Sequence, residues 1–168
     1  MDRAELQAVQ KPLKEQYREE PAAALIVLRA DGKLDEEKIA CKVDTGRALV
    51  EAGLHPATGG TGAFACSGDM LLEALVACAG VTLRSVATSM ELDVTGSVHA
   101  EGDLDFRGTL GVDREASVGF TAIRLRFDLV SDEPEEKLDK LVELSERYCV
   151  VGQTLAGGVP LEFSWKRA

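Results

Sequence analysis

The chain has 168 residues, a net charge of −10 and 45% hydrophobic residues, values that are typical of a soluble globular protein. Phosphate binding needs a basic surface, so the acidic charge argues against nucleic acid or an anionic membrane as a partner. The length is that of one domain, and we expect a single domain over residues 1–168, with residues 1–20 as a helical extension at its N-terminus.

The first segment predicts a surface helix over residues 2–18. Leu6, Val9, Leu13 and Tyr17 form one apolar stripe among charged residues. Pro12 should break or kink this helix, because proline lacks the N–H that a helix interior needs. The segment has no apolar core of a signal peptide, and no apolar run of the chain reaches the ~18 residues of a membrane span. We therefore expect a cytoplasmic protein without a membrane segment.

A hairpin is expected next, with strands over residues 23–30 and 37–44. Asp31-Gly32 supplies the turn chemistry between them. A third strand is expected over residues 45–52, and its sequence pattern is the weakest of the three. The glycine-rich stretch 55–69 follows as the longest irregular segment, and it lies directly before the most apolar part of the chain, as a functional loop would.

The most apolar segment predicts a helix over residues 69–90, capped by Ser67 or Asp69. Apolar residues cover all sides of its first half, which is typical of a central, buried helix. Beyond it the pattern predicts strands over 92–101, 103–110 and 120–130. A second helix starts around Pro134 and ends near Tyr148, and a closing strand spans 159–166. This order predicts an α+β fold with antiparallel sheets wrapped around central helices.

Four cysteines are present, and in a reducing compartment they are not expected to form structural disulfides. No CxxC pair occurs, and His55 and His99 stand alone, so no metal site is predicted. Cys78 lies in the apolar helix and Cys149 at the end of the second helix. Taken alone, each is more typical of a core residue than of a catalyst. Together they are also compatible with a thiol pair that cycles through a disulfide, provided that their Cα atoms lie close enough.

Four segments resemble the OsmC/Ohr family of osmotically inducible and organic hydroperoxide resistance proteins. GDMLLEALVACAGVTL (68–83) is similar to the helix that carries the family's first cysteine, and ERYCVVGQTLAGGVPLEF (146–163) to its second cysteine segment. HPATGGTG (55–62) resembles the glycine loop before that helix. The N-terminal KPLKEQYREEPAAALIVL (11–28) looks like a segment of one OsmC-like branch.

The resemblance implies an intertwined homodimer that reduces organic hydroperoxides in the stress response, with active sites at the subunit interface. It assigns Cys78 as the peroxidatic nucleophile and Cys149 as the resolving thiol. It implies no bound cofactor, but an external dithiol reductant such as a lipoyl-bearing protein. The apolar surroundings of Cys78 favour small apolar hydroperoxides over H2O2 as substrate.

The resemblance also implies an arginine, held by an acid, that stabilises the nucleophilic thiolate. Arg47 is the candidate arginine, with a solvated strand or turn residue as the alternative. Asp69 is the candidate acid, with a helix N-cap as the alternative, and Glu73 is a spare candidate.

Relatives often carry proline after the second cysteine, where this chain has Val150. We expect this difference to alter the local turn more than the chemistry. Cys41 and Cys66 are expected to be bystanders, although Cys66 could act as an alternative resolving thiol.

Two other functions stay open on the sequence. The protein could be a non-catalytic member of the family that binds a small apolar ligand or senses oxidants through the cysteine pair. A thiol-based carrier of acyl groups or sulfur would use the same cysteines. A basic group close to Cys78 would favour the peroxidase.

Overall fold

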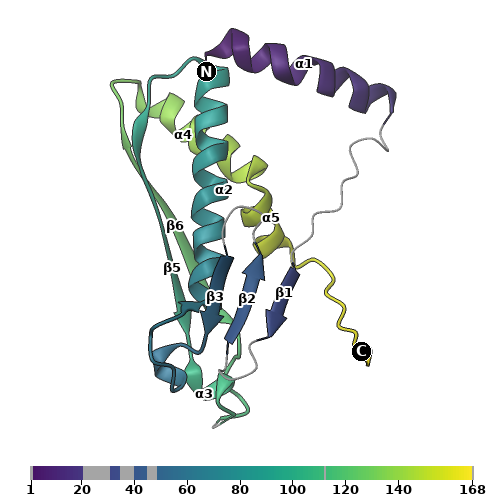
Figure 1. The fold of residues 1–168 in the computed structure, drawn as a ribbon. Coiled ribbons are helices and arrows are strands. Elements are labelled where there is room, and N and C mark those ends of the chain that lie inside the picture. The colour runs from purple at the N-terminus through teal and green to yellow at the C-terminus, as the bar shows by residue number, and fades with distance from the viewer. Residues whose placement is uncertain (1, 21–30, 35–39, 45–48, 112, 168) are drawn as a thin grey trace.

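The computed structural model describes residues 2–20, 31–34, 40–44, 49–111 and 113–167, and it has the predicted α+β architecture (Figure 1). A long central helix, α2 (Ser67–Met90), runs beside a hairpin of two long strands and contacts three further helices. The elements in chain order are α1 (Arg3–Glu19), β1 (Asp31–Leu34), β2 (Ala40–Asp44), β3 (Leu49–Gly53), the 3₁₀ turn η2 (Pro56–Thr58), β4 (Ala65–Cys66), α2, β5 (Thr95–Leu104), α3 (Phe106–Thr109), β6 (Phe120–Val130), α4 (Glu135–Tyr148) and α5 (Val150–Gly157).

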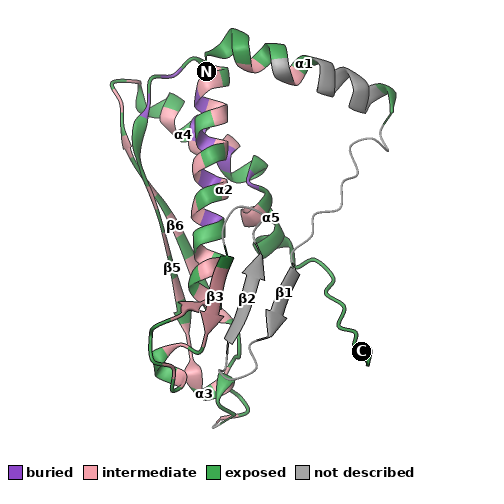
Figure 2. Cartoon of the chain, viewed as in Figure 1, coloured by how far each residue is buried: buried purple, intermediate pink, exposed green. Residues whose placement is uncertain are grey.

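Helix α2 buries one stripe of its surface and leaves another open. The buried stripe repeats every fourth residue, which places its members on one face. On the opposite side Val81 is 72% exposed, so the expectation of a helix buried all round does not hold for the single chain (Figure 2). The helix ends at Glu91, whose left-handed backbone (φ 58°) returns its N–H to the last turn. The buried stripe consists of Leu75, Ala79, Leu83 and Ala87.

By length and composition alone, α2 is also long and apolar enough to cross a membrane, contrary to our expectation from the sequence. The core helix of a soluble protein passes the same test. The buried stripe of α2 packs against α4 and β5 of its own chain, and this packing accounts for the apolar residues of that stripe without a bilayer.

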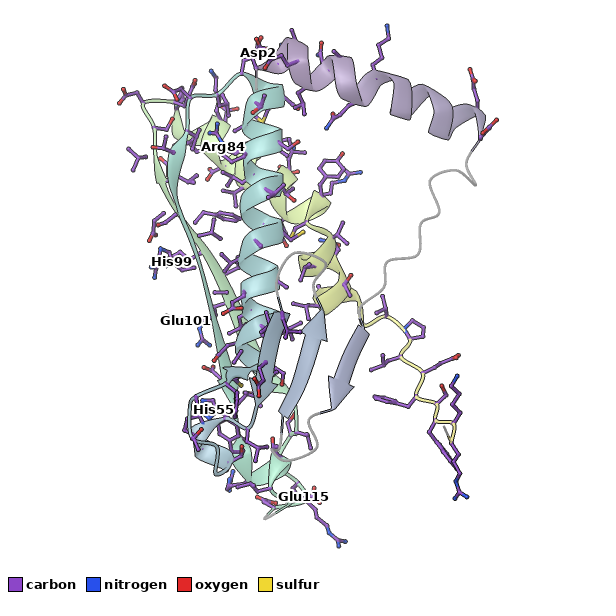
Figure 3. The ribbon with its side chains drawn as sticks, in the orientation of Figure 1. Asp2, His55, Arg84, His99, Glu101 and Glu115 are labelled. Carbon is purple, nitrogen blue, oxygen red and sulfur yellow. The ribbon has the colours of Figure 1, made fainter. Side chains whose placement is uncertain are left out.

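Two sheets flank the central helix. The first has the order β1-β2-β3-β4, with antiparallel pairs except for the parallel pair β3-β4. The second is the antiparallel hairpin β5-β6, whose register runs from Thr95 opposite Val130 to Leu104 opposite Phe120. Along β6 half-buried residues alternate with exposed ones, as the period of the sequence predicted. His99 and Glu101 point away from α2, on the outer face of the hairpin (Figure 3).

Helix α4 packs against α2 and closes the core. Its Leu141 is completely buried and packs in one cluster with Leu83, Ala87, Leu92 and Val94. This cluster fixes the far half of α2. A second cluster surrounds the near half, and it contains both Cys78 and Cys149.

Two predictions for the first half of the chain are corrected by the structure. Helix α1 continues through Pro12, because one lost hydrogen bond in the middle leaves the helical bonds on both sides intact. Asp31-Gly32 lies inside β1, opposite Asp44 and Val43, so it is not the hairpin turn. The strand expected over 23–30 lies outside the described residues, as do residues 45–48 of the third strand.

Three more corrections fall in the second half. The strand expected over 103–110 is the end of β5 followed by α3, because Asp105 accepts the N–H of Arg107 and caps that helical turn. Helix α5 was not expected. Residues 159–166 form no strand here, and Phe163 and Trp165 are 90% and 86% exposed because no described strand pairs with them.

Replacing Leu141 by alanine should lower the free energy of unfolding by about 2–5 kcal/mol, because the side chain is fully buried between α2 and α4. Urea unfolding followed by circular dichroism measures the change. Val130→Ala is the matched control, since this β6 side chain is 69% exposed and its loss should cost less than about 1 kcal/mol. Equal losses in the two variants would contradict the assignment of the core.

Candidate active site

The fold brings Cys78 of α2 and Cys149, directly before α5, into contact. The two residues belong to one apolar cluster with Leu75, Ala79 and Val151. The Cys149 thiol donates a hydrogen bond to the Cys78 sulfur. Both are free thiols in this structure, Cys149 buried and Cys78 half-buried. The sequence alone left open whether the two cysteines approach each other, and the structure places them together.

The surroundings of the pair push the two pKa values apart. Burial raises the pKa of Cys78, but hydrogen bonds from Val151, Cys149, Val150 and Thr82 outweigh it, so the pKa of this thiol falls below its ordinary value. Burial also raises the pKa of Cys149, and the neighbouring Cys78 sulfur raises it further. Cys78 is therefore the thiol that ionises first, while Cys149 keeps its proton and donates it in a hydrogen bond.

A break between α4 and α5 positions Cys149. Its backbone is extended (φ −73°, ψ 105°), and it serves as the last cap of α4 and the first cap of α5. The sulfur accepts the N–H of Gly152 at 3.4 Å. A side chain at Gly152 would begin 3.3 Å from that sulfur, closer than ordinary contact, so glycine lets the helix start against the thiol. Sequence reasoning missed this turn because cysteine is not a usual helix cap.

Thr82 is a site residue that sequence reasoning did not identify. It lies four residues after Cys78 on α2, on the same face, and its hydroxyl donates a hydrogen bond to the Cys78 sulfur. The i, i+4 spacing of a hydroxyl residue and a cysteine on a predicted helix was the available signal.

A pocket of about 620 Å³ opens beside the pair, between α2, β6, α4 and α5. Cys149 contributes to its wall. Most of the remaining lining is apolar, with the buried Ser145 turned to its own helix through a 2.6 Å hydrogen bond to the Leu141 carbonyl. An apolar molecule could enter it next to Cys149, whereas Cys78 is not among the residues that line it. The apolar lining includes Leu75, Ala79, Phe120, Ile123, Leu125, Phe127, Val142 and Leu155.

The predicted acid does not lie at the thiol pair. Asp69 is exposed in the first turn of α2, nine residues and about 13 Å along the helix axis from Cys78. It lines a different pocket, together with Cys66. Asp69 is not the N-cap either, because Cys66 occupies that position. Glu73 is exposed and lies about 140° around the helix from Cys78. Its charge is therefore in solvent and needs no partner to offset a cost of burial.

The candidate arginine, Arg47, lies outside the described residues. Within the part of the chain that the structure describes, no cationic side chain contributes to the lowered pKa of Cys78. Arg124 and Arg126 are engaged on the outer face of the hairpin, where Arg124 binds Asp103 at 2.6 Å and Arg126 binds Asp128 at 2.9 Å.

Of the other two cysteines, Cys66 stands apart from the pair. Cys66 lies twelve residues before Cys78, about 18 Å along the helix axis, and this distance argues against it as a resolving thiol. Cys41 belongs to β2. Among the described residues no group of three His, Cys, Asp or Glu side chains could hold a metal ion.

Replacing Thr82 by valine should raise the pKa of Cys78, because it removes one donor to the thiolate and keeps the side-chain shape. The pH midpoint for alkylation of Cys78 by iodoacetamide should move upward by about half a unit to one unit. Thr82→Ser keeps the hydroxyl and should keep the wild-type midpoint. A Thr82→Val midpoint equal to that of wild type would show that the hydroxyl does not act on the thiolate.

Solved structures with the same fold include three OsmC or hydroperoxide resistance proteins. An OsmC-like protein from Mycoplasma pneumoniae has a TM-score of 0.65 at 16% identity, over 79% of this chain and 89% of that one. Organic hydroperoxide resistance proteins from Legionella pneumophila (17% identity, 80% and 92% covered) and Elizabethkingia anophelis (16%, 80% and 91%) each have a TM-score of 0.57. Similarity at these identities shows the fold.

No curated protein has a sequence that matches this chain. The model of the family described as OsmC-like protein matches residues 60–164, which are more than half of the chain. These residues include the end of the glycine loop, α2 with Cys78, the β5-β6 hairpin and the segment around Cys149. The chain therefore belongs to the OsmC-like protein family.

Proposed function

We propose that this protein is a thiol-dependent peroxidase that reduces organic hydroperoxides. The observation that carries the proposal is the contact between two thiols of unequal acidity, with Cys78 ionising first and Cys149 donating to it. A thiolate is the nucleophile in peroxide reduction, and a second thiol within contact can capture the oxidised product. Organic hydroperoxide resistance proteins share this fold.

The reaction follows from the roles of the two sulfurs. The Cys78 thiolate attacks the terminal oxygen of the hydroperoxide, the O–O bond breaks, and the departing alkoxide takes a proton to leave as an alcohol. Cys78 is then a sulfenic acid. The Cys149 sulfur attacks the Cys78 sulfur, a disulfide forms, and the hydroxyl of the sulfenic acid leaves as water with the Cys149 proton. An external dithiol, such as a lipoyl-bearing protein, reduces the disulfide and becomes a disulfide itself.

The pocket beside Cys149 supports small apolar hydroperoxides as substrate. Its walls are mainly leucine, isoleucine, phenylalanine and alanine side chains, which can pack against an alkyl or aryl group. These apolar walls offer few hydrogen-bond partners to the small polar molecule H2O2. The reaction needs no bound cofactor or metal, since the electrons come from thiols.

We further propose a homodimer in which a second copy covers the open face of α2. Ala74, Ala77 and Val81 line this face, all three are exposed, and they lie next to the half-buried Cys78. Apolar surface of this kind on a core helix is typical of an interface. The net charge of −10 gives no support to nucleic acid as a partner, and we place the protein in the cytoplasm without a membrane anchor.

A second candidate function is binding of a small apolar ligand without turnover, with the thiol pair as an oxidant sensor at most. The apolar pocket of about 620 Å³ favours it, because this volume suits a small organic molecule whether or not chemistry follows. Turnover separates the two functions.

Replacing Cys78 by serine should abolish consumption of cumene hydroperoxide in the presence of dithiothreitol, because serine supplies no thiolate. Cys149→Ser should still form a sulfenic acid on Cys78, which dimedone traps, but no intramolecular disulfide. Cys66→Ser is the matched control and should turn over like wild type, since Cys66 is distant from the pair. Absence of turnover in wild type, with both thiols unreactive, would favour the ligand-binding function.

Replacing Val81 by glutamate should convert a dimer to a monomer at micromolar concentration, because it places a charge in the proposed interface. Light scattering coupled to size-exclusion chromatography gives the mass. Val130→Glu alters an equally exposed valine at the end of β6 and should leave the mass unchanged. A monomeric wild type would contradict the dimer.

A further inference from the structure

The pocket beside Cys149 has a negative charge at its mouth. Of the described residues that line it, Glu146 of α4 is the one with a charged side chain. Glu146 lies one helical turn before Cys149, whose N–H bonds back to the Glu146 carbonyl at 3.3 Å. Glu146 is exposed, so its carboxylate lies where the pocket opens to solvent. A ligand in this pocket therefore meets a negative charge close to the thiol pair.

The neutral polar side chains of the pocket are engaged with the backbone. Ser145 donates a hydrogen bond within its own helix at 2.6 Å, and Thr121 donates one to the facing strand β5 at 3.1 Å. Gln153 uses one of its two side-chain N–H groups on the Glu146 carbonyl, at 3.0 Å. A carboxylate that leaves water needs hydrogen-bond donors or a cation to replace its hydration. Ser145 and Thr121 have no further proton to donate, so this lining provides few such donors.

The cations on the elements that form the pocket are directed elsewhere. On α4, Lys137 and Lys140 each pair with a glutamate within about one turn, at 2.7 and 2.8 Å. Arg147 follows Glu146 directly, but its guanidinium lies over a neighbouring tyrosine ring, 5.6 Å from the ring centroid. Arg84 of α2 donates to a backbone carbonyl beyond the end of its helix at 2.6 Å. None of the cations on α2, β6 and α4 is among the described residues that line the pocket, and these cations are Arg84, Arg124, Arg126, Lys137, Lys140 and Arg147.

We propose that Glu146 is a specificity-determining residue, and that the pocket accepts hydroperoxides with an uncharged body and rejects those that carry a free carboxylate. Neutral alkyl, aryl and ester hydroperoxides are then the substrate class, and the hydroperoxides of free fatty acids are excluded from it. A carboxylate deep in the pocket loses its hydration without a cation to replace it, and one at the mouth faces the like charge of Glu146. The inference rests on the function proposed above, but the preference for neutral molecules is a property of the lining itself.

The test compares the affinities of the reduced protein for octan-1-ol and octanoate, two probes of equal chain length, by NMR titration at neutral pH and low salt. Shifts of the methyl groups of Ile123, Leu125 and Leu155 place the probe in the pocket. Wild type should bind octan-1-ol about tenfold more tightly than octanoate. Glu146→Gln should narrow this ratio by about three- to tenfold, because it removes the like charge and keeps the side-chain shape. Glu146→Lys should narrow the ratio further, since it supplies a cation.

Glu135→Gln is the matched control, because Glu135 is exposed on the first turn of the same helix and does not line the pocket. It should keep the wild-type ratio. An equal narrowing in Glu135→Gln would trace the preference to the net charge of the protein and overturn the role of Glu146. Equal affinities for the two probes in wild type, an unchanged ratio in Glu146→Gln, or shifts confined to methyl groups outside the pocket would overturn the inference as well.

Turnover supplies a second readout and separates this inference from the proposed function. Wild type should show a higher kcat/KM for the hydroperoxide of methyl linoleate than for that of linoleic acid, and Glu146→Gln should narrow the difference. If the binding ratios behave as expected but wild type consumes no cumene hydroperoxide, the peroxidase fails and the role of Glu146 stands. If wild type turns over both linoleate hydroperoxides equally and binds both probes equally, the role of Glu146 fails and the peroxidase stands.

Discussion

The hydrogen bond from the Cys149 thiol to the Cys78 sulfur is the interaction on which the rest of the site depends. It joins a residue in the middle of the central helix to the break between α4 and α5. That break is short and sharply defined, since Cys149 ends one helix and caps the next. The clusters around Leu141 and around Leu75 hold α2 on both sides of the contact, so the two sulfurs are placed by the core and not by a loop.

The electrostatics of the pair is a balance between burial and donors. An apolar cluster alone would raise the pKa of both thiols and make them inert. The pKa of Cys78 is nevertheless lowered, because Thr82, Cys149 and the start of α5 donate hydrogen bonds to its sulfur. Cys149 accepts hydrogen bonds from backbone N–H groups and lies next to the Cys78 sulfur, and its pKa stays raised. The pKa values of the two cysteines in this cluster therefore shift in opposite directions, as a nucleophile and a resolving thiol require.

The α+β class and the central helix were predictable from the apolar periodicity of the sequence, whereas the pair Cys78 and Cys149 was predicted only through the resemblance to the OsmC/Ohr family. Helix α5 was not, because its start is capped by a sulfur and its first turn contains Gly152. The end of β5 was misplaced because Asp105 turns the chain through a cap instead of continuing the alternation.

The candidate acid, Asp69, lies apart from the thiol pair in the single chain. Asp69 precedes Cys78 on the same helix, but a spacing of nine residues separates the two along the axis, and the sequence gives no information on what approaches from other elements. Two of the four donors that act on Cys78 are backbone groups of α5, and no side-chain pattern reveals these two. The exposed tail with Phe163 and Trp165 shows the same limit, since alternation predicts a strand but not where its partner lies.

The measurement that tests the central claim most directly is oxidation of the reduced protein by one equivalent of hydroperoxide without reductant, followed over time by peptide mass spectrometry. Cumene hydroperoxide and H2O2 should be compared. The account predicts that Cys78 is oxidised before any other cysteine, that a Cys78–Cys149 disulfide follows within one chain, and that cumene hydroperoxide reacts faster. First oxidation at Cys66 or Cys41, or no disulfide between Cys78 and Cys149, would contradict it, and equal rates with the two oxidants would refute the apolar substrate.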